Sequence, residues 1–165
     1  MRTTLLFFFS LFGFLSSAQT AFQTAYAENP NVPCGLLEAV AWTNTHMVHL
    51  NPTQEGCSGI PQAYGIMGLH DDGKGYFNEN GTLVANLSGI SVEEQKNAAA
   101  NQIEAYAKAF NQLMLNNGVT NPNDPILISK TLGQLSEIPT TGMVNVLARD
   151  LQVYSILNFM RSTEK

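Results

Sequence analysis

The segment from Ser91 to Met114 carries the strongest helical pattern in the sequence, and it constrains the fold more than any other feature. Ser91 is followed three residues later by Glu94, the spacing of a capping box at the start of a helix. Apolar side chains then recur every three or four residues, which places them on one helix face: Ile103, Tyr106, Ala107, Phe110, Leu113 and Met114. Such a face must be buried against other elements.

The rest of the chain offers further helices to cover that face. Apolar periodicity predicts a helix over 36–50, another over 126–138 and a last one over 143–160, with loops rich in Gly, Pro and Asn between them. With 165 residues, the chain has the length of one domain. We therefore predict a mainly α fold.

One stretch between the first two helices does not read as helix. "AYGIMGL", residues 63–69, is a short apolar run with internal glycines, typical of a buried strand or a tight loop. "DDGKG" at 71–75 and "ENGT" at 79–82 are hairpin-type turn signals. We expect a small β-like insertion here.

The first eighteen residues have the pattern of a targeting segment. Arg2 precedes an eleven-residue apolar run, Leu5 to Leu15, which is too short to span a bilayer, and "SSA" before Gln19 fits a cleavage site. We predict a signal peptide over 1–18, a loose lead-in over 19–33 with some helix around "AFQTAYA", and one domain over 34–165. A rival cut follows "AYA", residues 25–27. With either cut, the signal peptide predicts that the protein is secreted or periplasmic.

The charge balance excludes several classes of partner. The chain has 8 basic and 13 acidic residues, and removing Arg2 with the signal peptide leaves 7 − 13 = −6. Nucleic acids and anionic membrane surfaces both require clustered Lys and Arg, and the sequence has no such cluster. We predict no nucleic-acid partner and no membrane association of the mature form. The sequence makes no prediction of oligomeric state.

Two cysteines, Cys34 and Cys57, remain after cleavage. An even count in an exported chain favours a disulfide, and a loop of this length is stabilised by about 3 kcal/mol in the chain-entropy model. The bridge would tie the start of the first helix to the segment just before residues 63–69. The alternative is a reactive thiol, although nothing nearby in the sequence would lower its pKa.

The first helix presents an unusual residue on its apolar face. Leu37, Val40 and Ala41 are followed at helical spacing by Asn44 and then Met47. An amide on a buried face is costly unless a hydrogen bond satisfies it. Asn44 is therefore expected to have a specific partner or a specific role.

Three segments in order resemble a known family. "LLEAVAW" (Leu36–Leu37 and Ala39–Trp42), "GIMGL" (65–69) and Asn101–Phe110 resemble the lysozyme-like domain of lytic transglycosylases and goose-type lysozymes. The resemblance is closest to the domain that precedes the catalytic domain in some secreted N-acetylmuramoyl-L-alanine amidases. It covers residues 34 to about 160. It implies a lysozyme-like helical domain, with peptidoglycan glycan strands as the partner.

The resemblance places Asn44 where the family has its catalytic glutamate. Glycosidic cleavage needs a general acid held protonated near neutral pH, and an asparagine cannot supply it. Other acids that could serve are Asp71 and Asp72, which follow the cleft segment but also read as turn residues. Glu38 is not expected to replace the missing acid, because it lies about 120° around the helix from Asn44 and points elsewhere.

The resemblance also suggests ligand contacts. Residues that would line the cleft and touch sugar are Tyr64, Met67, His70 and Tyr76. For Trp42 two interpretations stay open, stacking on a sugar ring and packing in the core. A metal site built on His46, His49, His70 and Asp71 is a weaker alternative, because a helical HxxH without the glutamate of a zincin motif is unspecific. We predict no metal and no cofactor.

Three functions follow from these observations. The first is an exported lysozyme-like domain that binds glycan strands in its cleft without cutting them. The second is an active glycosidase or lytic transglycosylase that uses another acid, and the third is a non-catalytic helical interaction module. A buried, hydrogen-bonded Asn44 under a closed groove favours the third, whereas an open groove lined by Tyr64 and Met67 favours the first two. Any amidase activity would lie outside this chain.

Overall fold

The structure is a computed structural model that describes residues 19–51, 62–71 and 79–163. The fold is mainly helical, as the sequence predicts. After a helical segment over 19–28, the named helices are α2 (Leu36–Thr45), α3 (Asn80–Ser88), α4 (Val92–Asn97), α5 (Ala99–Asn116), α6 (Pro125–Ser136) and α7 (Met143–Thr163).

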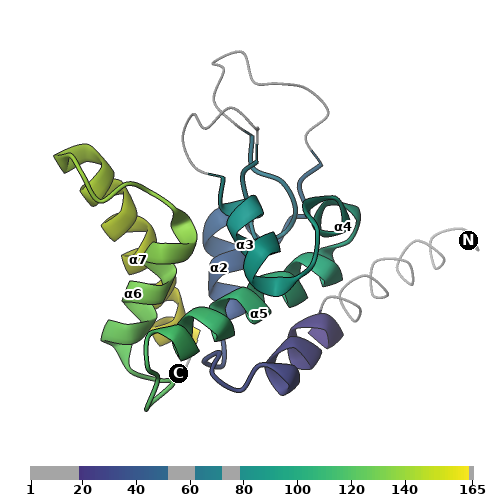
Figure 1. The fold of residues 1–165 in the computed structure, drawn as a ribbon, viewed down its shortest axis with the longest axis horizontal. Coiled ribbons are helices and arrows are strands. Elements are labelled where there is room, and N and C mark those ends of the chain that lie inside the picture. Colours follow the sequence, from purple (N-terminus) through teal and green to yellow (C-terminus); the bar gives the residue numbers. More distant parts are fainter. Residues whose placement is uncertain (1–18, 52–61, 72–78, 164–165) are drawn as a thin grey trace, which may run out of the picture.

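Helix α5 runs diagonally across the molecule in Figure 1, with α2, α3 and α4 above it and the helical segment 19–28 below it. Helices α3 and α4 pack on one part of α5, and α6 packs on another. Helix α7 contacts both α2 and α6. The last helix therefore lies against the first part of the fold, and this contact brings Asn44 next to α7.

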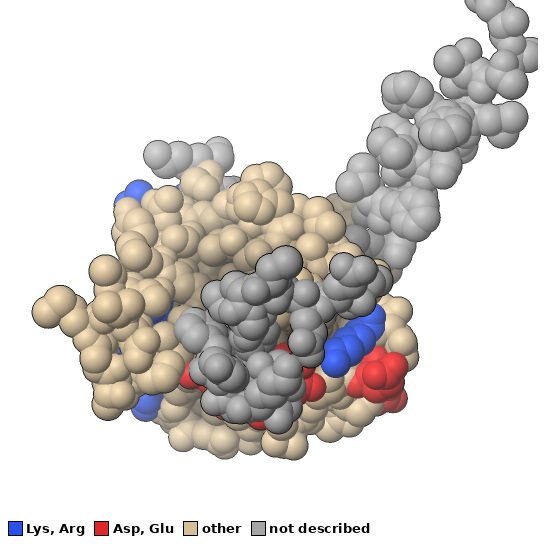
Figure 2. Space-filling model, turned by 90° about the horizontal axis from the view of Figure 1, so that it is seen from above, with Lys and Arg blue, Asp and Glu red and all other residues tan. Residues whose placement is uncertain are grey.

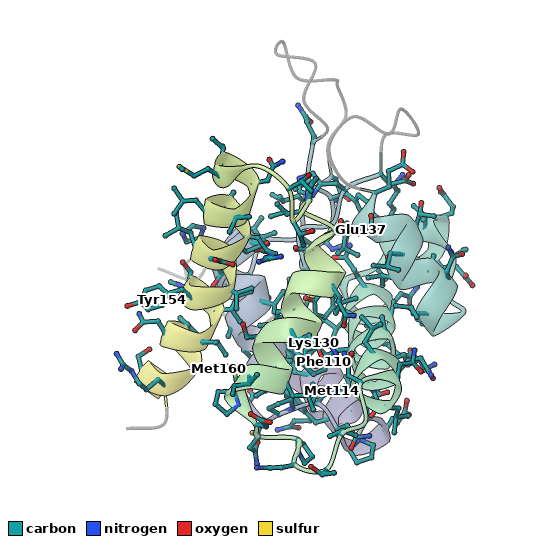
Figure 3. All side chains as sticks on the ribbon, turned by 60° about the vertical axis from the view of Figure 1, so that its left-hand side comes forward. Phe110, Met114, Lys130, Glu137, Tyr154 and Met160 are labelled. Atoms are coloured by element: carbon teal, nitrogen blue, oxygen red, sulfur yellow. The ribbon has the colours of Figure 1, made fainter. Side chains whose placement is uncertain are left out.

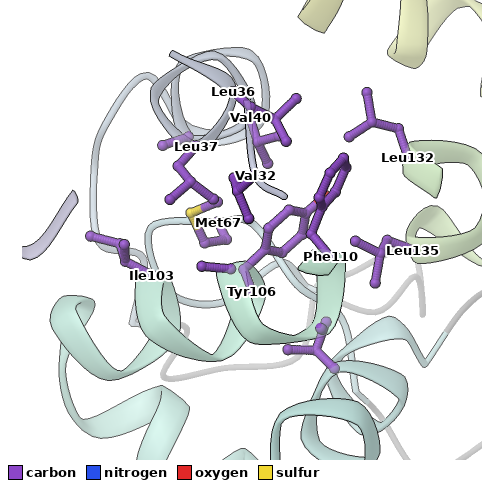
Figure 4. Close-up of a cluster of buried hydrophobic side chains, with 14 of the residues drawn as sticks. Val32, Leu36, Leu37, Val40, Met67, Ile103, Tyr106, Phe110, Leu132 and Leu135 are labelled. Carbon is purple, nitrogen blue, oxygen red and sulfur yellow. The ribbon is translucent and has the colours of Figure 1, made fainter. Parts of the chain in front are cut away.

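The core is built on the apolar face of α5. Ile103, Tyr106 and Phe110 are buried, and they meet side chains of α2, of α6 and of the 63–69 segment (Figure 4). Leu36, Leu37, Val40 and Met67 are wholly buried. Fully burying one such side chain stabilises the fold by about 1.5–3 kcal/mol.

The predicted helix starts and ends are partly confirmed. Ser91 caps α4 with the expected capping box, and the Glu94 carboxylate accepts a hydrogen bond from the Ser91 amide at 2.9 Å. An extended residue, Ala98, then separates α4 from α5. Helix α6 begins with Asp124 as its cap and Pro125 in its first turn.

One expectation for the region between α2 and α4 is wrong, and a second is not confirmed. "ENGT" is not a hairpin turn, because α3 begins at Asn80. The side chain of Asn80 instead accepts a hydrogen bond from the backbone amide of His70 at 2.8 Å. The β-like insertion is not confirmed, since the described part of this region contains only two isolated antiparallel bridges, Leu50–Gly65 and Tyr64–Leu69.

The lead-in is more ordered than its composition suggests. Residues 19–28 are helical, and Phe22 is only 5% exposed, with Ala25 also buried. The Tyr26 hydroxyl donates to the Glu38 carboxylate and accepts from the Leu37 amide at 2.9 Å. This segment therefore packs on the start of α2 as part of the core.

No helix within the described ranges is both long enough and apolar enough to cross a bilayer.

Candidate functional site

Helix α2 ends in a sharply turned backbone directly after Asn44 and Thr45. His46 and Met47 both have left-handed backbone angles, with φ of 54° and 64°. A left-handed conformation costs a residue other than glycine about 1–2 kcal/mol. The turn ends the helix earlier than the predicted residue 50 and directs the chain back along the 63–69 segment.

Both polar groups of the Asn44 amide have partners. Its nitrogen donates a hydrogen bond to the carbonyl of Met67 at 2.9 Å, and its oxygen accepts one from the amide of Gln152 on α7 at 3.2 Å. The side chain is half-buried. Asn44 therefore joins three parts of the fold: α2, the 63–69 segment and α7.

The 63–69 segment is held by two more polar side chains. The Thr45 hydroxyl lies 2.6 Å from the carbonyl of Ile66. From α5, the buried Gln102 accepts from the amide of Met67 at 2.7 Å and donates to the carbonyl of Tyr64 at 3.2 Å. Irregular backbone in a core must find such partners, because an unpaired buried polar group costs about 1–3 kcal/mol.

The glycines of "GIMG" allow these contacts. Gly65 and Gly68 have φ of +68° and +65°. A Cβ on Gly65 would lie 2.1 Å from the Gln102 side chain, and one on Gly68 would lie 2.7 Å from the Cβ of Asn44. The glycines in this motif thus let the backbone approach Asn44 and Gln102 closely.

The space beside Asn44 is small. A cavity of about 10 Å³ lies between Asn44, Tyr106 and Gln152, with Asn80 and Ser136 also on its wall. This volume is comparable to one water molecule and is far too small for a sugar ring. In this conformation α6 and α7 close off the position that the resemblance assigns to the catalytic acid.

The other predicted site residues within the described ranges do not line an open cleft. Met67 is wholly buried, and Tyr64 is 2% exposed. Burial, with the nearby Asp71 carboxylate as a second cause, raises the pKa of the Tyr64 hydroxyl. A ligand could touch these two side chains only if this part of the fold opened. His70 is half-buried, and the Asp71 carboxylate lies 3.4 Å from the Thr82 hydroxyl.

Some predicted residues lie outside the described ranges. Asp72, Tyr76 and Cys57 are among them. Cys34 is exposed at the turn that leads into α2. The disulfide between Cys34 and Cys57 stays a prediction. Among the residues that the structure describes, no three His, Cys, Asp or Glu side chains are grouped so that they could hold a metal ion.

A much larger hollow opens between α6, α7 and the start of α3. It has a volume of about 840 Å³, and we call it the α6–α7 hollow. Its charged lining residues are Glu79, Lys130, Glu137, Arg149 and Asp150. Val153 borders both this hollow and the small cavity beside Asn44. The hollow therefore lies next to the Asn44 position.

Glu137 has an unusual place at the edge of this hollow, at the end of α6 (Figure 3). It has a left-handed φ of 52°, and its carboxylate accepts a hydrogen bond from the backbone amide of Glu79 at 3.0 Å. This contact links the end of α6 to the start of α3. Sequence reasoning missed Glu137, since its only local signal is the end of a helical pattern.

Charged side chains are scattered on the face seen in Figure 2, where neither sign forms a continuous patch outside the grey regions. Within the hollow, the Arg149 guanidinium pairs with the neighbouring Asp150 at 3.2 Å. The site is thus polar and mixed in charge, which suits a ligand with many hydroxyl and amide groups better than a polyanion.

No protein-family model, curated protein or solved structure matches this chain significantly.

Proposed function

We propose that this chain is an exported, non-catalytic lysozyme-like domain that binds peptidoglycan glycan strands in the α6–α7 hollow. One observation carries the proposal. Asn44, which the resemblance puts at the position of the family's acid, is fixed by hydrogen bonds to Met67 and Gln152 beside an open polar hollow. The position is occupied by a structural amide, while a ligand-sized space remains next to it.

The chemistry of Asn44 argues against catalysis at this position. The Met67 carbonyl is an acceptor and needs a donor opposite it, which an amide provides and an ionised carboxylate does not. An amide has no proton to give to a leaving glycosidic oxygen. Asn44 thus supports the fold and takes no part in bond cleavage.

The hollow has properties that suit a glycan. Its volume of about 840 Å³ lies within the range of about 300–1,000 Å³ that is typical of ligand sites. Glu79 and Glu137 bring carboxylates that can accept from sugar hydroxyls, and Lys130 brings a cation for the carboxylates of peptidoglycan stem peptides. The tight space around Asn44 leaves the hollow as the best binding surface near the family's cleft position.

A co-sedimentation experiment tests binding in the hollow. The mature chain should pellet with purified, insoluble peptidoglycan. Lys130→Ala should weaken binding about fivefold, because one exposed ion pair contributes up to about 1 kcal/mol. Lys108→Ala is the matched control, because Lys108 pairs with Glu104 on α5 and does not line the hollow. If the native chain stays in the supernatant, the peptidoglycan proposal is wrong.

A second candidate function is an active glycosidase, and Glu137 is the observation that favours it. A non-glycine residue with a left-handed backbone is one of the kinds of strain found at active sites, and Glu137 brings a carboxylate to the hollow. In this case the native chain would release soluble muropeptides and Glu137→Gln would abolish the release. A chain that neither binds nor cuts would instead support the interaction-module alternative. The hydrogen-bonded Asn44 and the closed space beside it favour that alternative, and so do the exposed Met143, Val144, Leu147 and Leu151 of α7.

A further inference from the structure

A second groove lies on a different face, between α2 and α7. It has a volume of about 300 Å³, and we call it the α2–α7 groove. Trp42 lines it from α2 and His46 from the turn that follows, while Tyr154, Ser155, Asn158 and Phe159 line it from α7. No residue that lines the groove also lines the α6–α7 hollow. The two are separate surfaces.

The groove presents aromatic rings that are exposed but held in place. The Trp42 ring stacks on Phe159, with ring centres 5.7 Å apart and planes 25° apart, yet Trp42 remains 45% exposed. The His46 ring lies against the same indole at 5.5 Å. Tyr154 is 65% exposed and projects outward from α7 (Figure 3). These contacts fix the Trp42 ring before any ligand arrives, which lowers the entropy cost of binding.

The polar groups of the groove are already oriented. The Ser155 hydroxyl donates to the Leu151 carbonyl at 2.8 Å, and the Ser162 hydroxyl donates to the Phe159 carbonyl at 2.7 Å. Their protons are committed to the helix, so the two oxygens face a ligand as acceptors. The Asn158 oxygen accepts from Arg161 at 3.1 Å, which leaves the Asn158 NH₂ group as a donor.

The lining also limits the charge of the ligand. Within the described chain, the groove is lined by Trp, Thr, His, Tyr, Ser, Asn and Phe residues, without Asp, Glu, Lys or Arg. Arg161 lies at the edge of the groove, where its guanidinium donates to the Asn158 oxygen, so the lining itself offers no counter-charge to a charged ligand. A neutral ligand with an apolar face and a rim of hydroxyl and amide groups complements the groove.

We propose that the α2–α7 groove binds neutral N-acetylhexosamine units, with sugar rings stacked on Trp42 and Tyr154. The C–H face of a pyranose covers the aromatic surface. Its hydroxyl and acetamido N–H groups donate to the serine oxygens, and its carbonyl oxygen accepts from Asn158. This site does not depend on binding in the α6–α7 hollow.

Trp42 is the sole tryptophan of the chain, so its fluorescence reports on this groove directly. The mature protein is titrated with the β-1,4-linked tetramer of N-acetylglucosamine. We expect a saturable change in Trp42 emission. Tyr154→Ala should weaken binding about tenfold and Tyr154→Phe, which keeps the ring, should leave it within about twofold, since aromatic contacts contribute about 0.5–1.5 kcal/mol.

Leu147→Ala is the matched control, because Leu147 is 57% exposed on the same helix but does not line the groove. Urea unfolding of each variant reports on folding independently. Unchanged Trp42 emission at millimolar saccharide, or equal binding by native protein and Tyr154→Ala, would overturn the proposal. So would emission that depends on protein concentration alone, which would show that a second copy fills the groove. Lys130→Ala should keep the full Trp42 response, which separates this site from the hollow.

Discussion

The side-chain nitrogen of Asn44 lies 2.9 Å from the carbonyl oxygen of Met67 and donates a hydrogen bond to it. This contact joins the end of α2 to the buried 63–69 segment, which is neither helix nor regular sheet. Gln152 completes the arrangement from α7, 108 residues further along the chain. The amide at this position has a structural task that a carboxylate could perform only in its protonated form.

Replacing Asn44 with Asp should therefore make stability depend on pH. An ionised Asp places a negative charge against the Met67 carbonyl and should destabilise the fold by about 1–3 kcal/mol at pH 7. Proximity to the carbonyl raises the folded-state pKa of the new carboxyl, so the loss shrinks as pH falls toward about 3.9, the unfolded value. Urea unfolding of the native and variant proteins at pH 7 and pH 4 measures the difference.

Gln112→Glu is the control for this change, since Gln112 is exposed and bonds only to Asn116. It should lower stability by less than about 0.5 kcal/mol at either pH. If Asn44→Asp behaved like the control, the hydrogen bond to Met67 would not contribute to the free energy of unfolding.

Gly65→Ala and Gly118→Ala form a matched pair. Both glycines have left-handed backbones, with φ of +68° and +76°. A Cβ on Gly118 meets nothing within 4 Å, whereas one on Gly65 would overlap the Gln102 side chain. We expect Gly118→Ala to cost about 1 kcal/mol and Gly65→Ala at least about 3 kcal/mol, measured by urea unfolding. Equal losses of stability in the two variants would show that the Gln102 side chain can move aside and does not hold the 63–69 segment in place.

The helical segment 19–28 makes a prediction about processing. Phe22 and Ala25 are buried and Tyr26 bonds to α2, so cleavage after Ala27 would remove part of the core. Under the proposed export we expect the mature chain to begin at Gln19, which the mass of the processed protein would show. Phe22→Ala should cost about 3 kcal/mol. A stable mature protein that begins at Glu28 would contradict this account.

Buried tyrosines predict a loss of stability at alkaline pH. Burial is the main cause that raises the pKa of Tyr26, Tyr64 and Tyr106 above 10, with the Glu38 carboxylate adding to it at Tyr26. The unfolded chain releases these protons near pH 10 while the folded chain keeps them, so stability is complete below about pH 10 and falls above it. Tyr106→Phe should reduce the slope of unfolding free energy against pH in this range. An unchanged slope would show that Tyr106 does not contribute.

Local patterns predicted most of the helices but few of the contacts between them. The capping box at Ser91 and the apolar face of α5 are local properties, and the structure has both. The start of α3 was mispredicted because "ENGT" is a turn signal in isolation, while the His70 amide recruits Asn80 and the Tyr64 hydroxyl packs against Gly81. The lead-in has the helix expected around "AFQTAYA", but its polar residues obscured the burial of Phe22 and Ala25.

The candidate site was harder to predict for the same reason. An amide on the apolar face of α2 indicated that Asn44 needs partners, and it has them. The identity of those partners could not be read from the sequence, because Gln152 and Met67 reach Asn44 only through tertiary packing. Lys130 lies on α6 and Glu137 directly follows it, and nothing in their spacing marks the hollow that they line.

Muropeptide release from purified peptidoglycan tests the central claim most directly. The mature chain is incubated with the polymer at neutral pH, and both the bound fraction and the soluble fragments are measured. We expect the native chain to pellet with the polymer and to release no fragments, because Asn44 cannot act as the acid. Release of muropeptides by the native chain would contradict the proposal and would make Glu137 and Asp71 the first carboxylates to replace.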